Sequence, residues 1–479
     1  MVDLFLIDAV RYGNGYMLLL LAIGGFLIWE WRSYQKLASF KGPFMAKFSN
    51  LWICYTTNTK KQYLDRYILT FSVNSARSGY KRSTWYLGNR FQPDRDHVFS
   101  IIDDEAHQKR RAQVAIGYSG KEIDGLEELV DKHVQKLIEL ITKRYISSES
   151  YLCPMDLARK ASFFTLDVIT DIAFGSTWGC ISQDADVDGW FEATDQYMEV
   201  AFWVGSFPVV NRLLRIPFIA KAMLPSDKDR TGAGRLIGMI KSAMEKHVQT
   251  EGHETKKDMM GSFFRRGISA SVAVSEASLA TIAGSDTTAT AIRATMLFAI
   301  TNPHVYRKLQ AEIDSVPRKE TIISEEQAKN LPYLQATIKE GVRIWPPTTS
   351  LTSKVTPQEG DTINGVFIPG GTEIGVCVWG VQRDKKIYGD DSMLFNPDRW
   401  LRASGEELES MERSLALVWG HGKNQCLGKS IALLELNKVF FELFKNFDFT
   451  LIDPSMPWNS NNIGLWLQKE MFVKVTARA

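Results

Sequence analysis

A glycine-rich loop that runs directly into a long apolar helix constrains this 479-residue chain more than any other segment. The loop reads Trp419-Gly-His-Gly-Lys-Asn-Gln-Cys-Leu-Gly428, and apolar residues then recur at helical spacing from about Leu427 to Phe447. Glycines permit close backbone approach and unusual dihedral angles. The helix start presents free N–H groups and a positive dipole to the sulfur of Cys426. This arrangement favours a thiolate at neutral pH, the form of cysteine that binds metal.

Cys426 is one of five widely spaced cysteines, none of which forms a Cys-x-x-Cys pair. This number and spacing argue against a disulfide framework or a structural zinc site. A buried, inert thiol is the default for each cysteine, and only the surrounding loop raises Cys426 above it. A nucleotide-binding loop is excluded because Gln425 stands where the third glycine of Gly-x-Gly-x-x-Gly would fall. We therefore predict that Cys426 is the thiolate ligand of a haem iron, with Trp419 shielding its sulfur.

The composition is that of a large globular enzyme, with 45% hydrophobic and 23% charged residues. A net charge of +2 with scattered basic residues argues against nucleic acid as a partner. Helical periodicity dominates residues 105–302, whereas residues 361–372 have the turn-punctuated pattern of a hairpin. We expect a mainly α fold with minor β sheets.

The N-terminal segment predicts a membrane anchor. Residues 12–29 carry no charge and are strongly apolar, close to the length that a membrane helix needs. Trp29 and Trp31 follow as an aromatic belt, and basic residues come next. The alternative, a cleaved secretory signal, lacks a basic region directly after Met1 and a small-residue cleavage site. We expect residues 1–41 to be anchor and linker, and residues 42–479 to form one large cytosolic catalytic domain.

A second motif, Ala283-Gly-Ser-Asp-Thr-Thr288, lies inside a helix predicted from about Ser275 to Thr301. Glycine and β-branched threonines are poor helix formers, so a requirement other than helix propensity placed them there. Close packing on a neighbouring helix satisfies that requirement as well as a catalytic role does.

Three further patterns contain charged residues whose simplest interpretation is a solvated surface. Glu340 and Arg343 lie on one helix face, where an ion pair contributes little if it is exposed. The segment Phe395-Asn-Pro-Asp-Arg-Trp400 follows further along the chain. Residues 103–111 resemble an acidic helix start followed by a basic face.

Together these motifs resemble the cytochrome P450 family, in particular its fungal, microsomal, membrane-anchored members of secondary metabolism. The family's cysteine loop has an aromatic residue, a glycine and the cysteine at the spacing of Trp419, Gly422 and Cys426. Two positions depart from the family pattern. Trp419 replaces the usual phenylalanine, and Asn424 replaces the arginine that commonly stands two residues before the cysteine. The resemblance implies the cytochrome P450 fold.

The resemblance also implies a role for individual residues. Cys426 would bind the iron of protoporphyrin IX (heme b) as its axial ligand. Thr287 would hydrogen-bond dioxygen, and Asp286 would relay protons. Further haem contacts, including those to the propionates, would come from Lys423, His107, Arg111, Lys354, Trp419, Gly420 and Gly428. A buried structural network would consist of Glu340, Arg343 and Arg399. The substrate pocket would include Ala283, Gly284, Thr348, Thr349 and Leu351.

The activity implied is insertion of one oxygen atom from O2 into a lipophilic small molecule. No flavin or nicotinamide motif occurs in the chain, so electrons would come from a separate NADPH-cytochrome P450 reductase at the endoplasmic reticulum membrane. Lys423, Lys429 and Arg110 would attract an acidic surface of that reductase. Two alternatives stay open. The first is oxidative ring closure, desaturation or aryl coupling without net oxygen transfer. The second is a non-enzymatic haem sensor or carrier.

Overall fold

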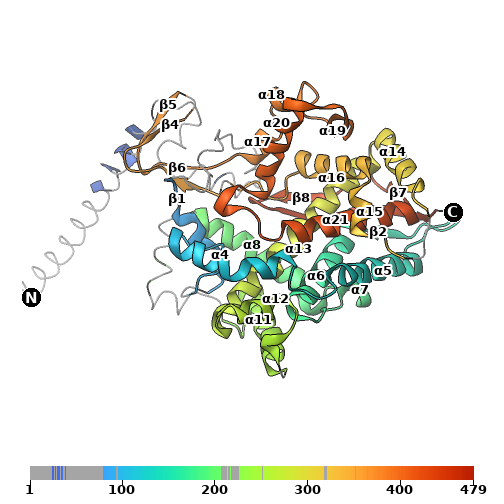
Figure 1. Cartoon of the computed structure of the whole chain (residues 1–479), viewed down its shortest axis with the longest axis horizontal. Helices are drawn as coiled ribbons and strands as arrows, with labels where there is room; N and C mark the ends of the chain where they lie inside the picture. Colours follow the sequence, from blue (N-terminus) through green and yellow to red (C-terminus); the bar gives the residue numbers. More distant parts are fainter. Residues whose placement is uncertain are drawn as a thin grey trace, which may run out of the picture.

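The computed structural model describes residues 79–478 apart from 93–94, 207–212, 214–215, 217–225, 251, 318–320, 351 and 364, together with scattered positions between 24 and 55. In this part of the chain the fold is mainly helical with small antiparallel sheets, as predicted (Figure 1). The helices are α4 (Asp104–Ser119), α5 (Leu126–Arg144), α6 (Leu157–Phe174), α7 (Cys180–Gln183), α8 (Trp190–Ser206), α11 (Gly232–Gln249), α12 (Met259–Arg265), α13 (Ala270–Ile300), α14 (Pro303–Asp314), α15 (Glu325–Lys329), α16 (Pro332–Ile344), α17 (Val378–Val381), α18 (Lys385–Tyr388), α19 (Asp398–Arg402), α20 (Gly405–Ala416) and α21 (Lys429–Asn446).

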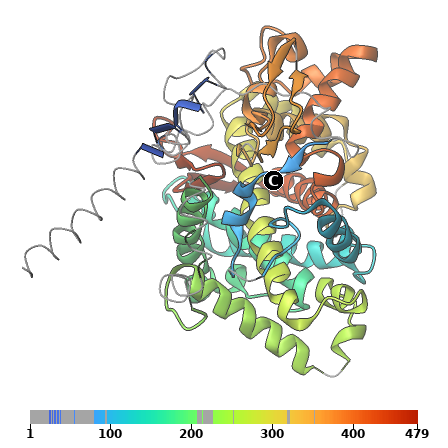
Figure 2. The ribbon, with the colours of Figure 1, turned by 90° about the vertical axis from the view of Figure 1, so that its left-hand side faces the viewer.

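Within the described residues, the strands form four small sheets. Three-stranded sheets have the orders β1-β3-β6 and β2-β10-β7, and β4-β5 and β8-β9 are hairpins. The β4-β5 hairpin confirms the strands predicted within residues 361–372 and projects from one end of the molecule (Figure 2). The strands are β1 (Lys81–Arg82), β2 (Pro154–Asp156), β3 (Lys354–Val355), β4 (Asp361–Ile363), β5 (Val366–Ile368), β6 (Glu373–Ile374), β7 (Phe447–Leu451), β8 (Asn459–Asn462), β9 (Trp466–Lys469) and β10 (Phe472–Ala477).

The predicted membrane anchor, residues 1–41, lies outside the described residues apart from a few scattered positions. Where the structure does describe the chain, no helix is both long and apolar enough to cross a membrane. The division into residues 1–41 and 42–479 therefore stays a prediction.

Local sequence signals explain where the main helices begin and end. The Asp103 carboxylate caps α4 by accepting a hydrogen bond from the Ala106 N–H at 2.8 Å. The predicted helix from about Ser275 to Thr301 is α13, and Pro303 opens α14 directly after it. Proline cannot continue a helix but suits its first turn, so this residue separates the two helices.

The long helix α13 is the centre of the molecule and packs against α6, α11, α16 and α21 (Figure 1, Figure 2). Two glycines permit this close packing. A Cβ on Gly284 would lie 2.8 Å from Ile169 Cγ1 of α6, and a Cβ on Gly341 would lie 1.9 Å from Thr295 Oγ1. Close helix packing therefore explains the glycine of the second motif. Its predicted place in the substrate pocket stays a prediction.

A buried ion-pair network joins α16 to the segment before α19. Glu340 Oε1 lies 2.7 Å from Arg343 Nη2 and 3.1 Å from Arg399 Nε. The backbone N–H of Asn396 also donates to this oxygen, at 2.8 Å. A second carboxylate, Asp391, lies 2.9 Å from Arg399 Nη1 and was not predicted. The structure thus brings together the three residues expected to form a structural network and adds a fourth.

This network reaches the cysteine loop through one glutamine. Arg343 Nη1 donates to the carbonyl oxygen of Gln382 at 2.6 Å, and Gln382 Nε2 donates to the carbonyl oxygen of Ser414 at 2.7 Å. Ser414 lies near the end of α20, which continues through the short helix η6 (Leu417–Trp419) into the loop of Cys426. The buried arginine therefore helps to fix where that loop begins.

Replacing Arg343 with glutamine should lower the free energy of unfolding by about 3–5 kcal/mol, because it leaves the buried Glu340 carboxylate with one guanidinium partner instead of two. The matched control is Lys339→Gln on the same helix. Lys339 pairs with Glu412 at side-chain exposures of 38% and 51%, so its loss should cost about 0–1 kcal/mol. Urea unfolding measures both variants, and equal destabilisation would contradict the structural role of Arg343.

Candidate functional site

The cysteine loop is closed by its own backbone. The N–H of Cys426 donates to the carbonyl oxygen of Trp419 at 2.7 Å. Gly420 has a φ of 72°, and a Cβ there would lie 2.7 Å from the Asn424 carbonyl oxygen, so only glycine fits. Gly428 has a φ of −85°, so the expected unusual backbone angle is absent at that position.

The sulfur of Cys426 lies at the start of α21, as the sequence suggested. The backbone N–H groups of Gly428 and Lys429 hydrogen-bond to it, and the Arg111 charge also favours its thiolate form. The residue is exposed, but the protein around the sulfur raises the pKa of the thiol by desolvation, which outweighs these groups. The helix start therefore favours the thiolate as expected, although desolvation opposes it. A coordinating metal ion would supply further stabilisation of the thiolate, because a metal deprotonates a coordinating thiol.

Arg82 is a site residue that the sequence analysis missed. It lies on β1 with 6% exposure, and its Nε donates to the Asn424 Oδ1 at 2.9 Å. Its Nη1 donates to the carbonyl oxygens of Phe99 and Ile101 at 3.0 and 2.9 Å. A guanidinium from a distant strand thus contacts the position where the resemblance led us to expect an arginine.

Arg82 lies directly opposite Lys354 in the antiparallel pairing of β1 and β3. Lys354 is only 2% exposed, and its Nζ has no hydrogen-bond partner among the described residues. Burial, followed by the charges of Lys423 and Arg82, lowers the pKa of Lys354 to about 8. Like charges that face each other across two strands destabilise a sheet, so this pair requires an anion nearby.

Three more basic side chains belong to this region. Lys423 Nζ lies 2.9 Å from Asp104 Oδ2, and its side chain is 7% exposed. Burial, followed by the charges of Arg82 and Arg111, lowers the pKa of His107 to about 3, so its imidazole is neutral. The Nδ1 of His107 has no hydrogen-bond partner in the part of the chain that is described. We call the following residues the basic cluster: Arg82, His107, Arg111, Lys354 and Lys423.

The basic cluster fits the two carboxylates of a haem. Asp104 is the one carboxylate that forms an ion pair with it within the described part of the chain, so positive charge exceeds negative charge. Arg111 interacts electrostatically with the sulfur of Cys426, which shows that the cluster and the cysteine belong to one site. The residues present would therefore hold haem through Cys426 on the iron and through the basic cluster on the propionates.

Two residues expected to attract a reductase are half-buried and form ion pairs with acidic residues of the protein. Lys423 is engaged by Asp104, as described above. Arg110 Nη1 pairs with the buried Glu276 carboxylate at 2.8 Å and is 19% exposed. Both side chains are therefore engaged within the protein, and their attraction of a reductase stays a prediction. Lys429 is half-buried, and its Nζ lies 5.9 Å from the centroid of the Trp419 ring.

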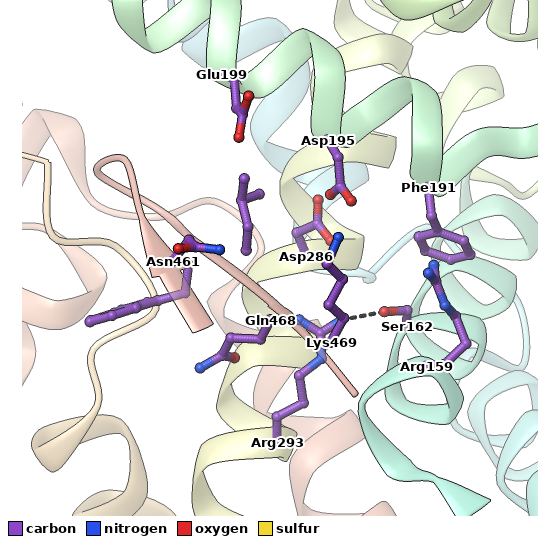
Figure 3. Close-up of a pocket in the computed structure, with 12 residues that line it drawn as sticks. Arg159, Ser162, Phe191, Asp195, Glu199, Asp286, Arg293, Asn461, Gln468 and Lys469 are labelled. Carbon is purple, nitrogen blue, oxygen red and sulfur yellow. Dashed lines mark hydrogen bonds between the residues drawn. The ribbon is translucent and has the colours of Figure 1, made fainter. Parts of the chain in front are cut away.

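The second motif distributes its residues over two neighbouring faces of α13. Ala283 is exposed although α13 is buried along most of its length, and Thr287 Oγ1 donates to the Ala283 carbonyl oxygen at 2.7 Å. Asp286 instead lines a polar pocket together with Arg293 (Figure 3). Burial, to which the Asp195 charge adds, raises the pKa of Asp286 to about 6. The motif thus supplies a hydroxyl and a titratable carboxyl from consecutive residues on neighbouring faces of α13.

Two of the remaining residues predicted for the substrate pocket lie near the β8-β9 hairpin. Thr348 forms an isolated antiparallel bridge with Leu465. Thr349 is buried, and its hydroxyl donates to the Asn462 Oδ1 at 3.0 Å. Leu351 lies outside the described residues. The Thr349 hydroxyl is therefore already hydrogen-bonded within the protein.

Replacing Arg82 with methionine should weaken haem binding roughly tenfold or more, because a charge-assisted hydrogen bond to a carboxylate contributes about 1.5–3 kcal/mol. The control is Lys81→Met. Lys81 is exposed, and alternation along β1 turns its side chain to the opposite face. Titration of the apoprotein with haem, followed by visible absorbance, compares the two variants. Equal affinities would exclude Arg82 from the haem site.

Comparisons with known proteins identify the family of this chain. A family model for cytochrome P450 matches residues 26–475. The chain is 36% identical over 478 residues to cytochrome P450 monooxygenase ABA1 of Pyricularia oryzae, covering 93% of each chain. It is 33% identical over 460 residues to cytochrome P450 monooxygenase aba1 of Botryotinia fuckeliana, covering 90% of each.

A third relative is cytochrome P450 monooxygenase abl1 of Leptosphaeria maculans, which is 34% identical over 456 residues. That alignment covers 88% of this chain and 80% of the relative. Since the family model and all three relatives span most of the chain, including the cysteine loop and α13, the chain belongs to the cytochrome P450 family of monooxygenases.

Proposed function

We propose that this enzyme inserts one oxygen atom from dioxygen into a lipophilic small molecule of fungal secondary metabolism. The observation that carries the proposal is the succession of the titratable Asp286 and of Thr287, whose hydroxyl donates to the carbonyl oxygen of the exposed Ala283 on α13. Electrons would come from NADPH through a separate cytochrome P450 reductase at the endoplasmic reticulum membrane. The fungal origin of the relatives supports the setting in secondary metabolism.

The basic cluster and Cys426 would position the cofactor, heme b. When bound, haem supplies the centre at which dioxygen is reduced and its O–O bond is broken, assisted by the electron-donating thiolate. Arg82 and Lys354 would neutralise a propionate, and their mutual repulsion would be relieved in return. The backbone N–H groups of Gly428 and Lys429 would hold the sulfur of Cys426 in place.

Asp286 and Thr287 would supply the protons that reduction of dioxygen consumes. A pKa of about 6 leaves Asp286 mostly ionised at pH 7 with a protonated minority, so it can both accept and release protons. The Thr287 hydroxyl, now donating to the Ala283 carbonyl oxygen, can turn to donate to a bound molecule. The predicted proton relay is therefore chemically feasible with the groups present.

Two alternatives use the same site. Oxidative ring closure, desaturation or aryl coupling would also need Asp286 and Thr287, but the product would contain no added oxygen. A haem sensor or carrier would bind haem and show no turnover. A product whose mass shows no added oxygen would indicate the first alternative instead of oxygen insertion. Consumption of NADPH in the presence of reductase would distinguish an enzyme from the second alternative, a haem sensor or carrier.

Replacing Cys426 with serine should abolish the reduced carbon-monoxide difference spectrum that is typical of a thiolate-bound haem. The control is Cys153→Ser, since the Cys153 sulfur lies 3.1 Å from the Arg144 carbonyl oxygen, where α5 ends. This control should retain the spectrum. A thiolate-type spectrum in the Cys426 variant would refute the assignment of the ligand.

Replacing Thr287 with alanine should lower the product formed per NADPH by roughly tenfold or more, because proton delivery contributes about 10²–10⁴-fold to such steps. Thr287→Ser keeps the hydroxyl and should keep most of the coupling. The measurement is turnover with reductase, NADPH and ¹⁸O2, in which the product gains one labelled atom. Full coupling in the alanine variant would contradict the role of Thr287, and an unlabelled product would contradict oxygen insertion.

A further inference from the structure

A polar pocket of about 90 Å³ lies beside α13 on the face that carries Asp286 (Figure 3). It is walled by α6, α8, α13 and the β8-β9 hairpin. A water molecule takes up about 30 Å³ in the liquid, so the pocket has room for roughly three waters. This volume is too small for a drug-sized ligand, which needs about 300 Å³ or more. Water is therefore the occupant that the pocket suits.

The charges around this pocket come from every element that walls it. Arginine or lysine charges act on the Asp195 and Asp286 carboxyl groups, so the charged part of the lining is able to hydrogen-bond water. Arg293 is 3% exposed and is held by a hydrogen bond of 3.1 Å to the Ala158 carbonyl oxygen and by the Ser162 hydroxyl. The charged residues are Arg159 of α6, Asp195 and Glu199 of α8, Asp286 and Arg293 of α13, and Lys469 of β9.

The three carboxyl groups form a series from solvent to α13. Glu199 is exposed, Asp195 is half-buried one helical turn earlier on α8, and Asp286 is half-buried on α13. Figure 3 shows Glu199 and Asp195 turned from α8 toward the pocket, with the Asp195 and Asp286 carboxyl groups directed toward each other. Burial raises the pKa of Asp195 as well as that of Asp286; the Glu199 charge adds to the rise at Asp195, and the Asp195 charge adds to the rise at Asp286. With a pKa of about 6, Asp286 can exchange protons near neutral pH.

We infer that this pocket is the entry for protons, which pass from solvent through Glu199, Asp195 and the pocket's water to Asp286. The inference rests on the proposed function and extends it to two residues of α8. Insertion of one oxygen atom consumes O2, two electrons and two protons and releases one water. The electrons are those that the reductase supplies, and the pocket carries only the protons. Asp195 and Glu199 therefore act through Asp286, as positioning and relay groups.

The test compares Asp195→Asn and Glu199→Gln with Glu192→Gln in the haem-loaded enzyme. Glu192 is an exposed acid on the same helix and does not line the pocket, so it controls for loss of a carboxylate from α8. With reductase and NADPH, the two pocket variants should form about tenfold less product per NADPH, below the 10²–10⁴-fold effect of a directly acting acid. Their solvent deuterium isotope effect should increase, whereas the control should match the unaltered enzyme.

A second readout needs no turnover. The infrared carbonyl band of protonated Asp286, assigned by its loss in Asp286→Asn, should titrate with a midpoint near pH 6 in the unaltered enzyme. The Asp195 charge raises the pKa of Asp286, so Asp195→Asn should move the midpoint to lower pH. An unchanged midpoint in Asp195→Asn overturns the inference whether or not product forms.

The two proposals fail in different ways. Coupling and isotope effects in both pocket variants equal to those of Glu192→Gln would overturn the proton entry, while product formation by the unaltered enzyme upholds the proposed function. Absence of product from the unaltered enzyme would refute the proposed function, and the infrared titration would still decide whether Asp195 and Asp286 act together.

Discussion

The repulsion between Arg82 and Lys354, buried opposite each other on β1 and β3, is the constraint on which the site depends. Such a pair is unfavourable in a sheet unless an anion lies beside it. The single carboxylate of Asp104 is engaged by Lys423, so it does not neutralise the whole cluster. The repulsion between Arg82 and Lys354 therefore destabilises the protein without its cofactor. Binding of an anionic cofactor would reduce this repulsion, and the reduction would contribute to the cofactor's affinity.

The cysteine loop depends on more distant parts of the chain than its own glycines. Arg82 reaches it from β1, and the network of Glu340 and Arg343 reaches it through Gln382. Both connections start from a buried arginine, which tolerates little displacement because an unpaired buried charge is costly. The loop is therefore held from both sides, a condition that a metal ligand needs if its sulfur is to keep a fixed position.

The helices and strands that could be predicted from the sequence are those whose own residues show a periodic pattern or a turn signal. The helix after Cys426, the long helix α13 and the β4-β5 hairpin all follow from periodicity and from turn or proline positions. Arg82 was missed because a strand of two residues has no periodicity, although alternation implies that one of two adjacent basic residues faces inward. The polar pocket could not be predicted at all, since its lining comes from four separate parts of the chain.

Helix α13 separates two kinds of electrostatic environment. The basic cluster has excess positive charge and suits a permanently ionised partner, as a haem carboxylate is. The pocket beside Asp286 has carboxyl groups and cations in similar numbers, and burial raises the pKa values of Asp195 and Asp286. A site with balanced, titratable charge can change its protonation without attracting a counter-ion, whereas the basic cluster cannot. Because Thr287 follows Asp286 directly, the helix connects proton exchange on one face to the exposed position of Ala283 on the next.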